Sequence, residues 1–324
     1  MLSLPASIFV PLPIKSTPKI AVTCGIALLG MVDLIWAHYI DLAFHGLSSI
    51  LGSMLLLALI GVFYDLSGRS KRLSDMGYYA ALWTGFSATA VIFTYLTASL
   101  NFPLHDALFA DLDAKMGFDW VALYLAVEGY PRFSALLGWA YDSMYVQLFV
   151  SMLYFAHKQW TRKNDELLLI AFISLVVTSI FSGVFPAVCA WHYFDLGIER
   201  SVHLSHLLSL RNGTAASFSI DQMQGIVTLP SYHTVIALLL IYVYRDQKWS
   251  FLLILALNVL MLLSVPFRGG HYLVDMIAAG ILFVLSAVVT KYVLRSRERA
   301  TVPDPAGTRP LMAPVVSGMR RPAS

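Results

Sequence analysis

"LPSYHTVIALLLIYVYRDQKWSFLLILALNVLMLLSVPFRGGHYLVDMIAAGILFVLSAVVTKYV", residues 229–293, decides the fold class of this chain. It contains three long apolar runs, at 230–245, 250–266 and 272–293, which only short polar segments separate. A helix that crosses a bilayer needs about 20 mostly apolar residues. The first run is short for a crossing, so we expect the ordered segment before it to complete that helix.

The rest of the chain continues this pattern. Of its 324 residues, 58% are hydrophobic and 13% are charged, and the mean hydropathy is +0.71. A soluble domain carries about 25% charged residues. The sequence therefore predicts an all-α integral membrane protein with about eight transmembrane helices, at 20–40, 46–64, 77–99, 134–156, 166–186, 230–245, 250–266 and 272–293.

The composition also divides the chain into four parts. Residues 1–19 form an N-terminal segment, and residues 20–64 form two additional transmembrane helices. Residues 75–293 form the main membrane domain. Residues 295–324 are rich in Pro, Arg and Ser and lack a periodic apolar face, which predicts a disordered tail.

The basic residues predict the orientation in the membrane. Of the 22 Lys and Arg residues, 17 lie in segments that eight crossings place on one side. Positive residues collect in the cytoplasm, so both termini are expected there. The segments 41–45, 100–133, 187–229 and 267–271 then face outwards. Because the net charge of +3 is distributed by membrane side, it gives no reason to expect a nucleic-acid partner.

One outer segment has a helical pattern of its own. In PLHDALFADLDAKMGFDW, residues 103–120, an apolar residue recurs every four positions, at Leu104, Leu108, Leu112 and Met116. Acidic residues occupy the other side. This pattern predicts a helix in the membrane interface, and an ordinary loop helix is the alternative.

The run at 230–245 begins with polar residues. Pro230 suits the first turn of a helix, and Ser231 lies where free backbone N–H groups attract anions. His233 follows at the outer end of the predicted helix. A cap at headgroup level is the alternative interpretation of these residues.

The next outer turn, PFRGGHYLVDMIAAG at 266–280, carries a second histidine. His271 and Asp275 are four residues apart, so they share one helix face, and a carboxylate inside a membrane needs a partner. A capping pair without chemistry is the alternative. His233 and His271 nevertheless fall at the outer ends of neighbouring helices. Two histidines in different environments suit a nucleophile and a general acid.

Arginines of the outer segments are candidates for phosphate binding, because their planar fork matches phosphate oxygens. They are Arg200, Arg211 and Arg268. The alternative is that they pair with lipid headgroups or with the acidic residues Asp195, Glu199 and Asp221.

No metal site is predicted. His203 and His206 have the spacing of two ligands on a helix, but no Asp, Glu or Cys completes a site. Cys24 and Cys189 fall on opposite sides of the predicted membrane, so they are expected to be packing residues and not a disulfide.

These motifs resemble the type 2 phosphatidic acid phosphatase superfamily. PSYH matches its second motif, Pro-Ser-x-His, and HYLVD matches the end of its third, His-x-x-x-Asp. The stretches GFDW, AYDSMYVQL and GIVTLPSYH, with the Tyr after the second His, look like bacterial members of the inositol phosphorylceramide synthase branch. The resemblance covers about residues 75–293 and implies a six-helix phosphatase-like core.

Two features depart from the superfamily. Its first motif, Lys-x6-Arg-Pro, is absent from the outer segments, and the Arg-Pro pairs at 309 and 321 lie in the tail. Its third motif also places Arg six residues before the His, where this chain has Val265. We therefore assign phosphate binding first to Arg211 and second to Arg268, with Ser231 and Gly270.

The resemblance implies a mechanism without metal or other cofactor. His271 attacks the phosphorus of a lipid phosphate or phospholipid while Asp275 holds its ring, and His233 protonates the leaving alcohol. Water as the acceptor would make the enzyme a phosphatase, and an alcohol such as inositol would make it a transferase. The expected location is the bacterial inner membrane, with the site on the periplasmic side.

Other functions remain as alternatives. A non-enzymatic lipid or solute transporter would place ionisable residues near the membrane midplane, and Asp33 and Asp142 favour it. A membrane protein with decayed motifs is disfavoured by the intact His–His–Asp set. A vanadium haloperoxidase shares the superfamily fold but requires the missing Lys and Arg residues.

Overall fold

A computed structural model describes the backbone of residues 18–301, and the predicted N-terminal segment and tail lie largely outside this range. The protein is 77% helical. Its first half contains α1 (Pro18–Tyr39), β1 (Ala43–His45), α2 (Leu47–Leu66), α3 (Lys71–Ala98), α4 (Asp106–Lys115), α5 (Trp120–Glu128), α6 (Pro131–Asp142) and α7 (Met144–His157). The second half contains α8 (Thr161–Val184), α9 (Ala190–Tyr193), η1 (Ile198–Arg200), α10 (Leu204–Arg211), β2 (Ser217–Ser219), η2 (Ile220–Gln222), α11 (Tyr232–Tyr244), α12 (Lys248–Arg268) and α13 (Leu273–Thr301).

The long apolar helices confirm the predicted fold class. In the described part of the chain, α1, α2, α3, α8, α12 and α13 are long and apolar enough to cross a membrane. The apolar helices α7 and α11 are shorter. All eight predicted stretches are helical, but the fourth, 134–156, is not one helix. It is divided at Ser143 into α6 and α7, and α13 continues beyond the boundary predicted at 295.

Helix α8 lies at the centre of the bundle and contacts α3, α7, α11 and α13. Its residues Leu167 and Ile170 are fully buried and belong to one apolar cluster with Phe155 of α7 and Ile236 of α11. In a bilayer, such side chains stabilise the bundle by close van der Waals packing, because lipid tails are as apolar as the protein interior. This cluster holds α11 in place and so positions the histidine in its first turn.

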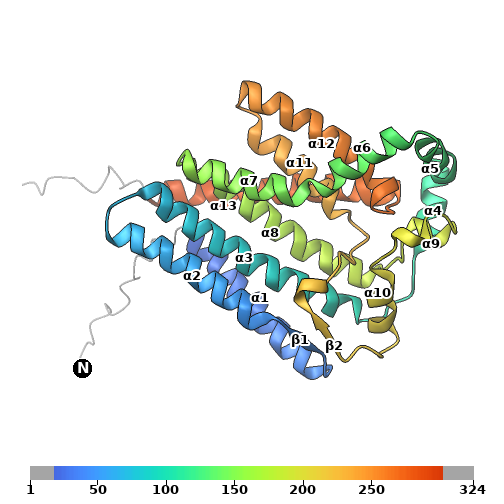
Figure 1. Ribbon diagram of the computed structural model, residues 1–324, viewed down its shortest axis with the longest axis horizontal. Helices are drawn as coiled ribbons and strands as arrows, with labels where there is room; N and C mark the ends of the chain where they lie inside the picture. The colour runs from blue at the N-terminus through green and yellow to red at the C-terminus, as the bar shows by residue number, and fades with distance from the viewer. Residues whose placement is uncertain (1–17, 302–324) are drawn as a thin grey trace, which may run out of the picture.

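The segments between the long helices gather at one end of the bundle. Figure 1 shows α4, α5, α9 and α10 together at the right of the view. Strands β1 and β2 pair in parallel there, with Ala43 opposite Ser217, and tie the α1–α2 connection to the segment before α11. These three-residue strands were not predicted, because they are too short to show an alternating pattern.

Helix α4 has the apolar stripe that its sequence predicts. Leu104, Leu108 and Met116 are 44%, 48% and 46% exposed, whereas Asp106 and Asp113 are buried. The polar face therefore points into the protein and the apolar face points outwards. This arrangement is the reverse of a soluble surface helix and suits a helix at the membrane interface.

Candidate active site

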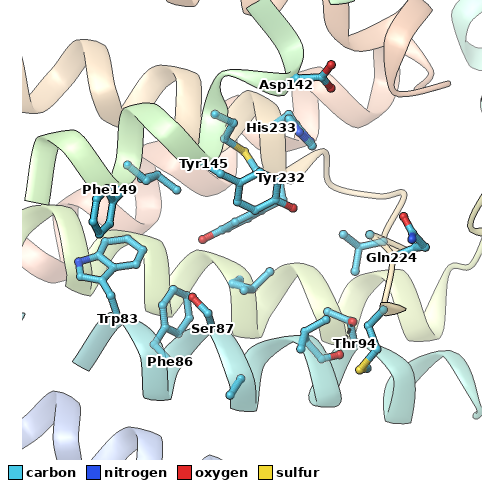
Figure 2. Close-up of a pocket in the computed structure, with 18 of the residues that line it drawn as sticks. Trp83, Phe86, Ser87, Thr94, Asp142, Tyr145, Phe149, Gln224, Tyr232 and His233 are labelled. Atoms are coloured by element: carbon cyan, nitrogen blue, oxygen red, sulfur yellow. Dashed lines mark hydrogen bonds between the residues drawn. The ribbon is translucent and has the colours of Figure 1, made fainter. Parts of the chain in front are cut away.

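A cavity of about 1290 Å³ contains three of the seven predicted site residues. His271, His233 and Arg268 line it, and so do Arg200 and His203. These residues come from α11, from the end of α12 and the turn before α13, and from the segment around η1. Figure 2 shows His233 at the edge of this cavity, near Asp142 of α6.

His271 and Asp275 form the pair that their spacing predicts. Nδ1 of His271 lies 3.1 Å from Oδ2 of Asp275, and Asp275 is fully buried. The same carboxylate oxygen accepts a hydrogen bond from the backbone N–H of Tyr272. A carboxylate on Nδ1 fixes the tautomer that leaves Nε2 free to act as a nucleophile.

The turn before His271 is held by close packing. Gly270 has φ +63°, and a Cβ atom there would lie 2.9 Å from the ring of Trp191. Its carbonyl accepts a hydrogen bond of 2.7 Å from the N–H of Ala190. The indole of Trp120 donates to the carbonyl of His271 at 3.2 Å. Gly270 does not line the cavity but allows this packing, because glycine adopts positive φ without steric cost.

His233 stands in the first turn of α11. Its ring stacks on Tyr141 of α6, with centroids 3.8 Å apart and an angle of 15° between the planes. Ser231 is fully buried, and its hydroxyl accepts from the N–H of Thr234, so it caps the helix and does not line the cavity. The N–H of Ser231 donates to the carbonyl of Asp275 at 3.1 Å. This bond connects the two histidine motifs.

The two cavity arginines share one hydrogen-bonded network. Arg200 forms a bidentate pair with Glu128, at 3.0 and 2.7 Å. Ser134 donates to Glu128 at 2.6 Å, and its hydroxyl accepts from Arg268 at 2.8 Å. The hydrogen bond from Arg200 holds the pKa of Glu128 below its ordinary value. Only Arg200 pairs directly with Glu128, whereas Arg268 bonds to the carbonyl and hydroxyl of Ser134. Asp142 also lines the cavity, so its capacity to bind an anion rests on the donors of the two guanidinium groups and not on a net positive charge.

Glu128 and Ser134 were not anticipated from the sequence. The expected acidic partners of Arg200 were those near it in the chain, whereas Glu128 is 72 residues away. A lone Glu before a Gly-Tyr-Pro turn carries no sequence signal for such a pairing.

The structure places Arg211 apart from the cavity. Its Nη2 donates to the carbonyl of Phe102 at 2.8 Å, and the residue does not line the cavity. The two histidines of the same segment also separate. His203 lies 3.2 Å from the carbonyl of Val188, and His206 lies 2.7 Å from the hydroxyl of Tyr95. Among the described residues, no cluster of three or more His, Cys, Asp or Glu residues could hold a metal ion.

Two aspartates of α4 support the site from behind. Asp106 accepts hydrogen bonds from the N–H groups of Val188 and Cys189, and from the hydroxyl of Tyr272 at 2.9 Å. Asp113 accepts from the N–H groups of Leu273 and Val274, at 2.7 and 3.0 Å, and so caps the start of α13. Neither the contact of Asp106 with Tyr272 nor the cap formed by Asp113 was predicted from the sequence. The available signal was their spacing of seven residues, which places them on one face opposite the leucines.

We expect Asp106→Asn to reduce both stability and turnover. An amide nitrogen in place of either carboxylate oxygen faces at least one backbone N–H group that donates to Asp106, which costs about 2 kcal/mol. The apparent melting temperature and kcat of the purified protein test this prediction. Asp111→Asn is the matched control, because Asp111 is exposed on the same helix and pairs only with Lys115 among the described residues. Equal effects of the two variants would contradict the supporting role of Asp106.

One comparison with known proteins finds a family for this part of the chain. The chain matches the family profile of the PAP2 superfamily over residues 107–289, from α4 to α13. This region contains the two histidines, Asp275 and both cavity arginines, whereas α1, α2 and α3 precede it. No curated protein and no solved structure matches the chain. More than half of the chain lies within the match, so this protein belongs to the PAP2 superfamily.

Proposed function

We propose that this protein transfers the phosphoryl group of a lipid phosphate through a covalent phosphohistidine at His271. Membership of the PAP2 superfamily supports phosphatase-type chemistry on lipid phosphates in general. The observation that carries the specific proposal is the shared cavity. It brings the His271–Asp275 pair, His233 and two arginines into one space.

In the first half of the reaction, Nε2 of His271 attacks phosphorus. The new N–P bond forms as the bond to the leaving oxygen breaks, and Asp275 stabilises the charge on the imidazole. His233, in its charged form, gives its proton to the leaving alcohol. Arg268 and Arg200 stabilise the charge on the phosphoryl oxygens in the transition state.

In the second half, an acceptor hydroxyl attacks the phosphorus of the phosphohistidine. His233, now neutral, takes the acceptor's proton while the N–P bond breaks, so both histidines return to their starting forms. Water as acceptor gives inorganic phosphate. An alcohol as acceptor gives a new phosphoester, as the resemblance to the inositol phosphorylceramide synthase branch implies.

The arginine network supports a phosphate clamp of Arg268 and Arg200. Arg211 was the first candidate from the sequence, but its guanidinium lies outside the cavity. We expect Arg268→Ala and Arg200→Ala each to lower kcat/KM about 100-fold, because each removes a charge-assisted contact to the transferred group. Arg211→Ala is the control, with an expected loss below about threefold. A larger loss of kcat/KM in Arg211→Ala than in the other two variants would instead assign phosphate binding to Arg211.

We also propose that the site faces the outer side of the membrane. Lys158 lies in the connection α7–α8, and Lys163 and Lys248 lie in the first turns of α8 and α12. All three are at the ends of these helices away from His271. Positive residues favour the cytoplasm, so the catalytic end is placed outside, in a bacterial inner membrane. Cysteine labelling at Asp119 and Lys158 with a membrane-impermeant maleimide, in a Cys24→Ser background, tests this. Labelling at Lys158→Cys but not at Asp119→Cys in intact cells would reverse the orientation.

Phosphate release by the purified protein tests the proposed function directly. Lipid phosphates and diphosphates are supplied in detergent, with the His271→Ala variant in parallel. Release that depends on His271 identifies a phosphatase. Transfer from a phospholipid to added inositol or a lipid alcohol, again dependent on His271, identifies a transferase. If neither reaction occurs with any donor, a transporter becomes the favoured function. Buried Asp33 is the structural evidence for a transporter, since neither of its carboxylate oxygens has a hydrogen-bond partner in the described part of the chain.

A further inference from the structure

The catalytic cavity continues far beyond the catalytic residues. Its lining residues on α3 run from Leu73 to Thr94, a distance of roughly 30 Å at the rise of an α-helix. This length is close to the thickness of the hydrocarbon core of a bilayer. Figure 2 shows lining residues of the cavity, with α3 below and α7 at the upper left. Trp83 and Phe149 lie towards one end, Thr94 and Gln224 lie towards the other, and His233 lies above and between them.

The walls of this long groove are mainly apolar. On α3, Met76, Trp83 and Phe86 line it, and Phe149 lines it from α7. Phe149 is 58% exposed although it lines the cavity. The groove is therefore open along its side, as entry of a hydrocarbon chain from the bilayer requires.

Helix α2 forms another part of the wall, through Ile50, Leu57 and Ile60. It is held close to α3 by a glycine contact. A Cβ atom at Gly77 would lie 2.6 Å from the backbone nitrogen of Gly61. Helix α2 lies outside both the resemblance over 75–293 and the matched region 107–289, so its part of the wall is an addition to the phosphatase-like domain.

Resting on the proposed function, we propose that this groove binds the hydrocarbon chain of the lipid phosphate, and that α2 and α3 make the enzyme selective for long chains. The phosphate is fixed at His271, so the chain must extend from that point along α3. Each methylene group that packs against a fitted apolar wall gains van der Waals contacts there, and these contacts add binding free energy for a chain that comes from the bilayer. In Figure 2, Trp83 of α3 and Phe149 of α7 lie opposite each other across the groove, where a chain of sufficient length reaches them.

Ser87 offers a position to block the groove without touching the catalytic end. It lines the cavity on α3, between Trp83 and Thr94, and its side chain is exposed. Ser87→Trp fills the groove at this level. Val150→Trp is the matched control, because Val150 is 53% exposed on α7 and does not line the cavity.

The experiment measures kcat/KM of the full-length protein in nanodiscs. The substrates are phosphatidic acids of one headgroup with chains graded from short to long. We expect Ser87→Trp to lower kcat/KM at least about tenfold for the long chains and less than about twofold for the shortest. Val150→Trp should follow the wild type throughout. An equal effect of Ser87→Trp on short and long chains, or no effect, would contradict the proposal that the groove binds the hydrocarbon chain.

A binding measurement separates this proposal from the proposed function. Non-hydrolysable phosphonate analogues of the same chains are titrated into wild type and Ser87→Trp. If the wild type shows no turnover but binds long chains more tightly than short ones, and Ser87→Trp removes this preference, the groove stands and the catalytic proposal fails. If binding is independent of chain length in the wild type, the groove fails whatever the turnover.

Discussion

His271→Ala is expected to abolish phosphoryl transfer, with a fall in kcat of at least about 10⁴-fold. The imidazole is the nucleophile of the proposed mechanism, and no other described nucleophilic side chain touches Asp275. The backbone N–H of Tyr272 still donates to Asp275 in the variant, so the turn keeps one of its hydrogen bonds. Steady-state phosphate release or transfer, measured on purified protein, checks the loss.

Trapping of the intermediate makes this prediction specific to chemistry. Wild-type protein quenched during turnover of a ³²P-labelled lipid phosphate should carry acid-labile, alkali-stable label on His271. His271→Ala should carry none. His271→Gln is the second variant, because it keeps a polar side chain beside Asp275 if the alanine variant fails to fold. Label on any residue other than His271, or normal turnover in either folded variant, would reject the mechanism.

His233→Ala is expected to lower kcat for alkyl phosphates by about 10²- to 10⁴-fold, the usual contribution of a general acid. The loss should depend on the leaving group. A phenolic leaving group such as para-nitrophenol needs little protonation, so its release from the substrate should be nearly normal. The second half-reaction still lacks its base, so the phosphohistidine should accumulate in this variant.

Rapid-quench measurement of the labelled enzyme distinguishes these steps. A burst of para-nitrophenol followed by slow phosphate release is the expected signature of His233→Ala. Tyr141→Phe is the control, because a phenyl ring preserves the stacking on His233 while it removes the hydroxyl. If His233→Ala slows alkyl and aryl substrates equally and no phosphoenzyme accumulates, His233 is not the general acid.

Part of the catalytic set could be predicted from short stretches of the chain. His271 and Asp275 are four residues apart, and the turn that leads into α13 brings them to 3.1 Å, although His271 itself lies just before the helix and not on its face as predicted. His233 follows a Pro-Ser cap at the start of an apolar run, so its place at a helix end was also readable. Both features depend on local geometry.

The hydrogen bonds that hold the site and the partners of its charged residues could not be predicted in this way. The pair Arg200–Glu128 spans 72 residues, and the hydrogen bond from Tyr272 to Asp106 spans 166. The expected role of Arg211 rested on its type and its neighbourhood in the chain. The packing of α10 places its guanidinium against the carbonyl of Phe102 instead. Such contacts depend on which segments meet, and one sequence carries no periodic signal for that.

The sequence by itself determined that this protein is an all-α membrane protein, because runs of apolar residues can be satisfied in a bilayer only as helices. It also determined that His271 and Asp275 lie close together, because they are four residues apart in the chain. Only the tertiary structure decided which arginines enter the cavity, that α4 buries its acids behind the catalytic turn, and that α2 forms a wall of the groove. The physical reason is that hydrophobicity and helical period act over a few residues, whereas these contacts arise from the packing of whole helices against one another.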